Sequence, residues 1–229
     1  HKLKGTYIMQ FTEQTLTVLK NFASINQALI FKPGTVVKTI NPHKSVMAVA
    51  TVDVEIPGEA CVYDMARFLS VLSLYTKPDV EFGAKAFTIS EGRRKTKYVY
   101  AEPSMVVAPP EKEMKLPPAD VTVSVKWDDI SSVIKAAGVL QLPEVAFVGE
   151  EGSIFLRAID SANPSADTFG VELEGSTDAT FTLILKTENL KLLPLDYEVA
   201  LASKGLSTFT GEGIRYFVAI EAKSTFKGA

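Results

Sequence analysis

The sequence predicts an α+β protein built from two copies of one domain plan. Three observations lead to this fold class. Amphipathic helical segments alternate with short β-rich runs, a proline-rich stretch divides the chain near its middle, and the second half repeats the element order of the first. With 229 residues and 46% hydrophobic composition, the chain is long enough for two modest domains, each with its own core.

The first half opens with a helical segment. Residues 12–25 place Leu16, Leu19 and Phe22 on one helical face and polar residues on the opposite face. Over residues 30–56 the pattern changes to short β-rich runs, which Pro-Gly and Asn-Pro turns separate. We therefore expect an amphipathic helix followed by antiparallel strands.

A second helix is expected over residues 65–75, because Asp64 stands directly before an apolar-periodic segment. A carboxylate at this position accepts hydrogen bonds from the free backbone amides of the first helical turn. Asp64 could instead act as a general base, but no histidine, lysine or second acid at a suitable spacing completes a catalytic site. Strands are then expected near 80–82, 85–90 and 95–100, with a Glu-Gly hairpin turn between the last two.

The middle of the chain reads as a linker. Residues 103–118 hold five prolines, which remove backbone hydrogen-bond donors and favour extended conformations. We place the boundary between two domains in this stretch.

The second half repeats the plan of the first. A strand over 121–126 precedes an amphipathic helix over 127–137, and Thr187 is placed to cap a short helix that Pro194 ends. The remaining strands are expected near 145–148, 153–159, 168–174, 179–185, 196–202, 206–210 and 214–222. Each half would then carry two helices and a set of antiparallel strands.

Composition argues against several functional classes. A single cysteine, Cys61, cannot form an internal disulfide, and His1 and His43 alone make no zinc-type cluster. Neither a phosphate-binding glycine loop nor a nucleophile elbow is present, so we expect no catalytic residue, no metal and no cofactor. The net charge of −3 argues against gripping nucleic acid by overall positive charge, which leaves local basic surfaces. No apolar run approaches a membrane span, and a soluble intracellular protein is expected.

Four segments carry a resemblance to a known family. In order and spacing they are similar to the DNA sliding clamps of T-even-type bacteriophages, and their specificity lies in this collinearity from Met9 to about Thr225. The segments are LKNFASIN at 19–26, YDMARFLSVLSL at 63–74, MVVAPP at 105–110 and YFVAIEAKST at 216–225.

The resemblance implies the DNA clamp fold. Three copies would form a head-to-tail ring in which helices line the hole and sheets form the outer wall. Because the family's first residue aligns with Met9, the expected division has four parts. They are an N-terminal extension or cloning remnant (1–8), a first clamp domain (9–104), an interdomain connector (105–119) and a second clamp domain (120–229).

The same resemblance implies the function and the partners. The chain would encircle double-stranded DNA without reading its sequence and would tether a replicative DNA polymerase, which docks a C-terminal peptide. An ATP-driven clamp loader and the phage late-transcription factors would be further partners, and the site of action would be the host cell cytoplasm, away from membranes. A phage structural protein with duplicated β-rich domains remains the alternative from a different class.

Basic residues recur on the polar faces of the expected helices. A lone surface lysine is usually only solvated, but each of the four helices carries one basic residue there, and the resemblance implies that this face looks into the hole. The candidates for contacting DNA are Lys20, Arg67, Lys135 and Lys191, with Lys126 and Lys186 just before two of the helices as weaker ones.

The connector is too apolar for a simple solvated tether, and surface apolar clusters tend to mark binding sites. By resemblance, the groove for the polymerase peptide lies under the connector. The candidate lining residues, which could equally be ordinary core, are Ile40, Val46, Val107, Leu116 and Ile220.

The resemblance also places the joint between subunits. It pairs the strand at 95–100 of one subunit with the strand at 167–174 of the next, and these two edges carry opposite charge. The alternative for the first is a solvated basic hairpin. The expected charged residues are Arg94, Lys97, Glu172 and Glu174, and the expected apolar ones are Tyr98, Tyr100, Phe169 and Val171.

Overall fold

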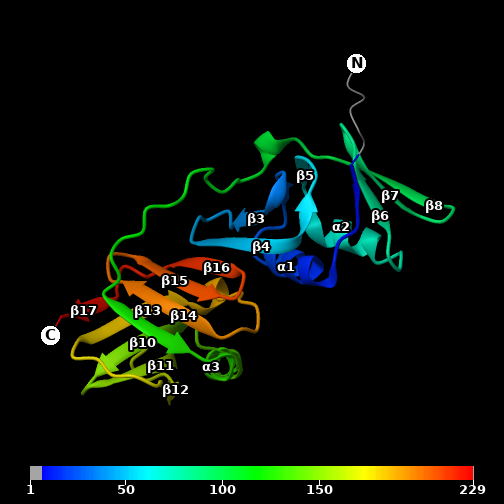
Figure 1. Cartoon of the computed structure of the whole chain (residues 1–229). Helices are drawn as coiled ribbons and strands as arrows, with labels where there is room; N and C mark the ends of the chain where they lie inside the picture. Colours follow the sequence, from blue (N-terminus) through cyan, green and yellow to red (C-terminus); the bar gives the residue numbers. More distant parts are fainter. Residues whose placement is uncertain (1–6, 229) are drawn as a thin grey trace. The chain divides into compact units, whose positions relative to one another are not determined.

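The structure, a computed structural model, describes residues 7–228 of the chain. The chain divides into two compact units between Glu111 and Lys112, inside the expected connector (Figure 1). We call residues up to Glu111 the first unit and those from Lys112 the second unit.

The first unit combines two helices with antiparallel strands. Helices α1 (Glu13–Ala23) and α2 (Met65–Leu72) pack against each other, and α1 also packs on β4. The strands are β1 (Tyr7–Met9), β2 (Leu29–Phe31), β3 (Gly34–Ile40), β4 (Val46–Ile56), β5 (Ala60–Val62), β6 (Asp79–Phe82), β7 (Ala86–Glu91) and β8 (Arg94–Val99).

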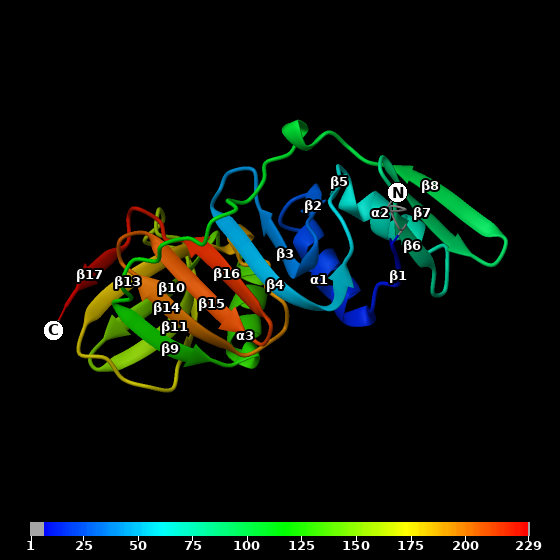
Figure 2. The ribbon, with the colours of Figure 1, turned by 45° about the horizontal axis from the view of Figure 1, so that its top comes forward.

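These strands form three antiparallel groups. The largest is a sheet in the order β1-β6-β7-β8, so β1 and β8 are its two edges (Figure 2). Strands β2 and β5 pair with each other, and β3 and β4 form a hairpin. A 3-10 turn, Pro103–Met105, leads into the connector.

The two predicted helices of the first half are confirmed, as is the predicted cap at Asp64, and Thr12 caps the first helix in the same way. The Thr12 hydroxyl oxygen accepts a hydrogen bond from the Thr15 N–H at 3.1 Å, and the Asp64 carboxylate accepts one from the Arg67 N–H at 3.0 Å. Each cap satisfies a backbone donor that the first helical turn leaves free. Asp64 is therefore a structural cap.

Aromatic side chains fill the core beneath the β1-β6-β7-β8 sheet. The ring centroids of Phe68 and Phe87 lie 4.8 Å apart, and Phe87 meets Tyr100 edge-on at the same distance. Edge-to-face pairs of this kind stabilise a core by about 0.5–1.5 kcal/mol each beyond area burial. The cluster comprises Phe11, Phe31, Phe68, Phe82, Phe87, Tyr98 and Tyr100.

The N-terminal boundary differs from the sequence expectation. Strand β1 begins at Tyr7 and pairs with β6 through Tyr7 with Phe82 and Ile8 with Glu81. Tyr7 and Ile8, which were expected to lie outside the fold, thus belong to the sheet because they complete the edge next to β6. The rest of the expected extension, 1–6, lies outside the described residues.

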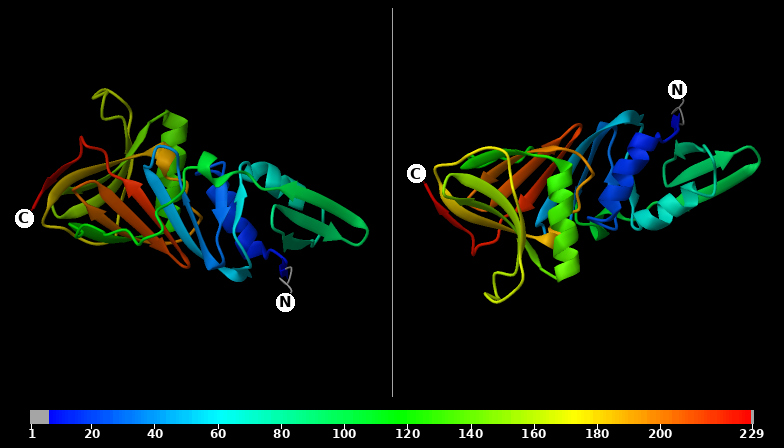
Figure 3. Two further views of the ribbon diagram at one scale, coloured as in Figure 1. Left: turned by 90° about the horizontal axis from the view of Figure 1, so that it is seen from above. Right: turned by 90° about the horizontal axis from the view of Figure 1, so that it is seen from below.

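The second unit carries one α-helix, α3 (Trp127–Leu140), which packs on the sheet that contains β10, β11 and β12 (Figure 3). That sheet has the order β12-β11-β10-β13-β17, and a further group has the order β16-β15-β14-β9. The strands are β9 (Val121–Val125), β10 (Glu144–Glu150), β11 (Ser153–Ile159), β12 (Phe169–Glu172), β13 (Thr180–Lys186), β14 (Tyr197–Ala202), β15 (Leu206–Gly211), β16 (Ile214–Ala219) and β17 (Thr225–Lys227).

The prediction of a fourth helix after Thr187 is wrong. Only a 3-10 turn, Thr187–Asn189, forms there. Beyond it, the Leu193 N–H donates to the Tyr216 hydroxyl at 3.0 Å, and the Tyr197 hydroxyl donates to the Leu193 carbonyl at 2.6 Å. Because two buried tyrosines satisfy both backbone groups of Leu193, this residue does not need helical hydrogen bonds.

Candidate functional site

Three of the candidate DNA-contacting residues lie where the sequence placed them. Lys20 on α1, Arg67 on α2 and Lys135 on α3 are all exposed, while the opposite faces of these helices are buried. Lys20 comes from the last turn of its helix, where a cation also interacts favourably with the helix dipole. Each α-helix of the described chain therefore presents one basic side chain to solvent.

The other three candidates differ in their surroundings. Lys191 is exposed but follows the 3-10 turn, so it does not stand on a helix. Lys126 lies 3.6 Å from the Glu174 carboxylate and Lys186 lies 3.8 Å from that of Glu221. Exposed pairs of this kind contribute only about 0–1 kcal/mol, so the two lysines can exchange their partners for phosphates at little cost.

A shallow apolar hollow lies beside the connector residue Leu116. Its volume is about 240 Å³, and Pro117, Ala119 and four residues of β14 and β15 complete the lining. Those four are Ala200, Ala202, Leu206 and Thr208, all of which the sequence analysis missed. Their signal was the presence of small side chains at alternate positions of β14, which leaves room above the sheet.

Only Leu116 of the five pocket candidates lines this hollow. Ile220 is buried, and its N–H donates to the Gly205 carbonyl at 2.8 Å, near the hollow but inside the core. Ile40 and Val46 are buried at the β3–β4 turn of the first unit. This environment fits the alternative interpretation given above, in which the pocket candidates are ordinary core residues. Val107 is exposed on the connector.

Both strands expected at the subunit joint are sheet edges. β8 ends the β1-β6-β7-β8 sheet and β12 ends the β12-β11-β10-β13-β17 sheet. An edge strand presents a row of backbone donors and acceptors that another strand can pair with. The geometry needed for strand addition is therefore present at both places.

The tyrosines of the expected joint point inward. The Tyr98 ring packs edge-on against Phe68, and the Tyr100 hydroxyl donates to the Gly83 carbonyl at 2.8 Å. Burial raises the pKa of Tyr100 to about 12. Both tyrosines are half-buried against the first unit, and their contribution to the joint stays a prediction.

Two apolar side chains outside the set of candidates are more exposed than the tyrosines. Val99, between the two tyrosines, is 64% exposed, and Leu74 is 66% exposed. The Arg94 guanidinium links Leu74 to the edge strand by donating to its carbonyl at 3.3 Å. On β12, Phe169 is exposed and Val171 is half-buried.

Part of the charge at the two edges is neutralised within the chain. Arg94 lies 2.9 Å from the Glu91 carboxylate, and Glu174 contacts Lys126. Backbone N–H groups of Lys77 and Thr76, together with Arg94, hold the pKa of Glu91 below its usual range. Lys97 and Glu172 remain exposed, with no ion pair in the part of the chain that the structure describes.

Neither metal binding nor thiol chemistry finds a site within residues 7–228. No group of three or more His, Cys, Asp or Glu side chains there is arranged to hold a metal ion. Cys61 is buried, and burial raises the pKa of its thiol, so it behaves as a small core residue. No helix of the described chain is long and apolar enough to cross a membrane.

Comparison with known proteins identifies the class first. PCNA of A. fulgidus, bound to the C-terminal region of FEN-1, superposes with a TM-score of 0.66 at 17% identity, covering 95% of this chain and 99% of that one. PCNA from Entamoeba histolytica gives a TM-score of 0.68 at 12% identity, covering 94% and 99%. The fold is that of a DNA clamp, as the sequence predicted.

The family follows from closer relatives. The family model described as DNA polymerase processivity factor matches residues 12–108, and the one described as gp45 sliding clamp, C terminal, matches residues 122–222. The chain is 32% identical to the sliding clamp of Vibrio phage KVP40, covering 93% of this chain and 100% of the relative. It is 31% identical to that of Enterobacteria phage T4, covering 95% and 99%.

The chain belongs to the gp45 sliding clamp family of T4-like phages. It is a DNA polymerase processivity factor, which acts by binding and not as an enzyme. The resemblance inferred from the sequence is confirmed, and the alternative of a phage structural protein is set aside.

Proposed function

We propose that three copies of this chain close into a ring around duplex DNA and hold the replicative polymerase on it. The observation that carries this proposal is the match of both halves to sliding-clamp family models in a chain that folds as two clamp units. Retention on DNA then comes from encirclement, because a net charge of −3 gives little general affinity for a polyanion.

The DNA-facing surface of the ring consists of the exposed faces of α1, α2 and α3. Lys20, Arg67 and Lys135 contact phosphates there, and Lys126, Lys186 and Lys191 add weaker contacts. Phosphate contacts carry no sequence information, so this surface accepts any duplex. A few such contacts suit a sliding protein, since strong phosphate binding would slow its movement along the DNA.

The polymerase docks a C-terminal peptide on the apolar hollow at Leu116. One clamp-fold neighbour supports a peptide as the occupant, because PCNA of A. fulgidus is described as bound to the C-terminal region of FEN-1. The hollow is small and apolar, which suits one or two anchoring side chains that dominate the affinity.

The subunit joint pairs the free edge of β8 with the free edge of β12 of the next copy. Val99 and Leu74 on one side and Phe169 and Val171 on the other supply the apolar contact. Lys97 and Glu172 supply complementary charge, which favours the correct orientation more than it adds affinity. The joint is small, so an ATP-driven clamp loader can open it.

The proposal includes one further class of partner, which the resemblance implied. Phage late-transcription factors use the same loaded ring, and the protein acts on DNA in the cytoplasm of the infected host cell. The first of these statements adds transcription to the proposed role in replication.

Polymerase processivity tests the proposal. We expect the cognate polymerase to make products at least about 10-fold longer from a primed circular template when the chain, the loader and ATP are all present. Omission of the loader should return the products to their basal length. Products of unchanged length in the complete mixture would contradict the proposal.

A further inference from the structure

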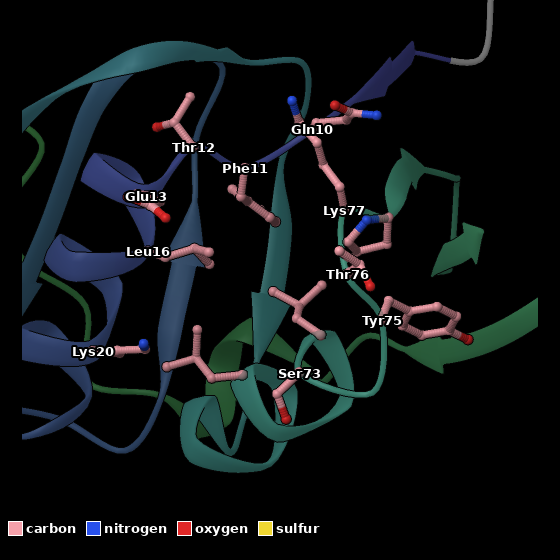
Figure 4. Close-up of a pocket in the computed structure, with 13 residues that line it drawn as sticks. Gln10, Phe11, Thr12, Glu13, Leu16, Lys20, Ser73, Tyr75, Thr76 and Lys77 are labelled. Atoms are coloured by element: carbon pink, nitrogen blue, oxygen red, sulfur yellow. The ribbon is translucent and has the colours of Figure 1, made fainter.

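The first unit contains a groove of which the proposed function uses only one residue, Lys20. It lies between α1 and the segment that follows α2, has a volume of about 700 Å³ and opens to solvent (Figure 4). We call it the α1 groove. Its lining residues are Gln10, Phe11, Thr12, Glu13, Leu16, Lys20, Leu69, Leu72, Ser73, Tyr75, Thr76, Lys77 and Pro78.

The floor of the α1 groove is apolar and fixed. Leu16 points into the groove from α1, and the Phe11 ring packs against Phe31 and Phe68 with centroids 6.0 and 6.2 Å apart. Leu69 and Leu72 of α2 complete this surface. Such a floor offers a flat apolar partner to a planar ring.

The wall opposite α1 is held from behind. The Glu91 carboxylate accepts the backbone N–H groups of Thr76 and Lys77, and the Tyr75 hydroxyl shares a hydrogen bond with that of Thr96 at 2.6 Å. These bonds fix the backbone of the wall and leave the Lys77 side chain exposed. The groove is therefore preformed and does not require ordering when a ligand binds.

Two cations face the α1 groove from opposite walls. Neither Lys20 nor Lys77 forms an ion pair within the described part of the chain, and Glu13 is the one carboxylate among the lining residues. Ser73, Thr76 and Gln10 also line the groove, and the Ser73 hydroxyl and Gln10 amide donate to the Ser70 carbonyl and the Asp79 carboxylate. The lining thus combines an apolar floor, hydrogen-bonding groups and an excess of one positive charge.

We propose that the α1 groove binds one unpaired nucleotide of a single DNA strand. The base rests on the floor at Leu16 and Phe11, and the flanking phosphates meet Lys20 and Lys77. Proteins that bind single strands without sequence preference combine these two features, a basic track and an apolar or aromatic platform. A paired base inside a duplex cannot reach the floor, so the groove selects unpaired DNA.

This inference rests on the proposed function in one respect. Lys20 is also a proposed contact for duplex DNA, so a strand that leaves the duplex inside the ring would pass the mouth of the α1 groove. The groove would then hold the clamp where single-stranded and double-stranded DNA meet.

Fluorescence anisotropy with the full chain at low salt tests the proposal. The probes are a short fluorescein-labelled oligothymidylate and an abasic oligomer of the same length and charge. We expect the oligothymidylate to bind at least about 5-fold more tightly, because stacking of the base adds to the phosphate contacts. Equal binding of the two probes would overturn the proposal.

Variants locate the site. Leu16→Ser removes part of the apolar floor and should abolish the preference for the oligothymidylate. Ser73→Trp fills the groove from the exposed end of α2 and should abolish the same preference without altering α1. Lys77→Ala should weaken the binding of both probes and reduce the slope of log affinity against log salt concentration by about 0.7. Lys85→Ala removes an exposed charge outside the groove and should change neither quantity.

Two further results would overturn the proposal. One is that Leu16→Ser and Ser73→Trp both keep the parent's preference for the oligothymidylate over the abasic oligomer. The other is that an acidic leucine-rich peptide binds more tightly than the oligothymidylate. The ring proposal is tested separately, because Ser73→Trp should still support loader-dependent processivity. Loss of processivity in the parent chain would contradict the ring and leave the oligonucleotide result standing.

Discussion

At the scale of single residues, exposure separates binding candidates from core. Leu116 is 42% exposed beside the hollow, whereas Ile220, predicted for the same pocket, is 6% exposed. Truncating an exposed anchor costs binding, while truncating a buried side chain costs folding. The two residues should therefore respond to substitution in different ways.

The variant Leu116→Ala should weaken binding of the polymerase C-terminal peptide about 10-fold and leave the free energy of unfolding within about 0.5 kcal/mol of the parent. Ile220→Ala should instead lower that free energy by about 2–5 kcal/mol. Calorimetry with the peptide and urea unfolding measure the two effects. Full peptide affinity in Leu116→Ala would place the docking site elsewhere.

The basic residues on the helices can be tested together. Changing Lys20, Arg67 and Lys135 to alanine should preserve the fold, because all three side chains are exposed. Loading on DNA should become weaker and its salt dependence flatter, by a slope of about 0.9 for each phosphate that is no longer neutralised. A matched triple variant of the exposed Lys85, Lys112 and Lys204 is the control. The same salt slope in both triple variants would argue against these helices as the DNA-facing surface.

A buried charge ties β10 to the segment before β17. The Glu144 carboxylate is buried, which alone would raise its pKa, but Lys223 and the Ser161 N–H at 2.7 Å outweigh burial and hold the pKa below its usual range. A lowered pKa stabilises the fold above the unfolded-state value near 4.5, and this contribution disappears as pH falls through the folded-state value.

We therefore expect Glu144→Gln to lower the free energy of unfolding by about 1–3 kcal/mol at neutral pH. The difference from the parent should shrink below pH 4.5 and disappear as the pH falls through the lower folded-state pKa, where the carboxylate of the folded parent becomes protonated. Urea unfolding across this pH range measures it, with Glu188→Gln as an exposed control. A difference that stays constant down to low pH would refute this assignment.

At the scale of elements, the helices show what the sequence could and could not predict. Leu19, Phe22 and the cap at Asp64 carry local signals, since period and capping act within a few residues. The segment at Leu193 could not be predicted in this way. Its backbone partners, Tyr197 and Tyr216, come from separate strands, and only the tertiary fold brings the second of them there.

The candidate sites also depend on tertiary contacts that local sequence patterns do not reveal. The alternation of β8 predicts two faces but does not say which one is buried, and Tyr98 has an apolar ring and a polar tip that suit either side. The hollow at Leu116 needs β14 and β15, whose residues lie about 80 positions further along the chain. Sequence patterns therefore predicted which strands and helices are exposed, but not which of their side chains are buried against the rest of the fold.

The edge strands allow a direct test of the subunit joint. Because Arg94 and Glu174 have partners within the chain, the apolar residues should dominate. We expect Val99→Asp to shift sedimentation from trimer toward monomer at all salt concentrations. The double variant Glu172→Lys, Glu174→Lys should weaken the trimer only at low salt, since screened surface pairs contribute about 0–1 kcal/mol each.

Met105→Asp places the same charge on an exposed connector residue and should leave the trimer unchanged. A Val99→Asp chain that sediments like the parent would remove β8 from the joint. If the double variant dissociates equally at low and high salt, Glu172 and Glu174 do not stabilise the trimer through their charge.

At the scale of the whole molecule, a net charge of −3 gives the chain little general affinity for DNA. In the proposed ring, topological linkage would replace affinity, so the chain would need only a moderately basic inner surface and a joint that a loader can open. The central claim is therefore encirclement. An encircling ring can slide off a free DNA end, whereas a protein held by surface contacts stays on linear and circular DNA alike.

Retention on nicked circular duplex tests this claim most directly. After loading with the clamp loader and ATP, the labelled chain should remain on the circles through gel filtration at a salt concentration that abolishes phosphate contacts. Cutting the circles once with a restriction enzyme should then release it, because the ring slides off the free ends. A chain that leaves the intact circles, or that stays on the linear DNA, would contradict encirclement.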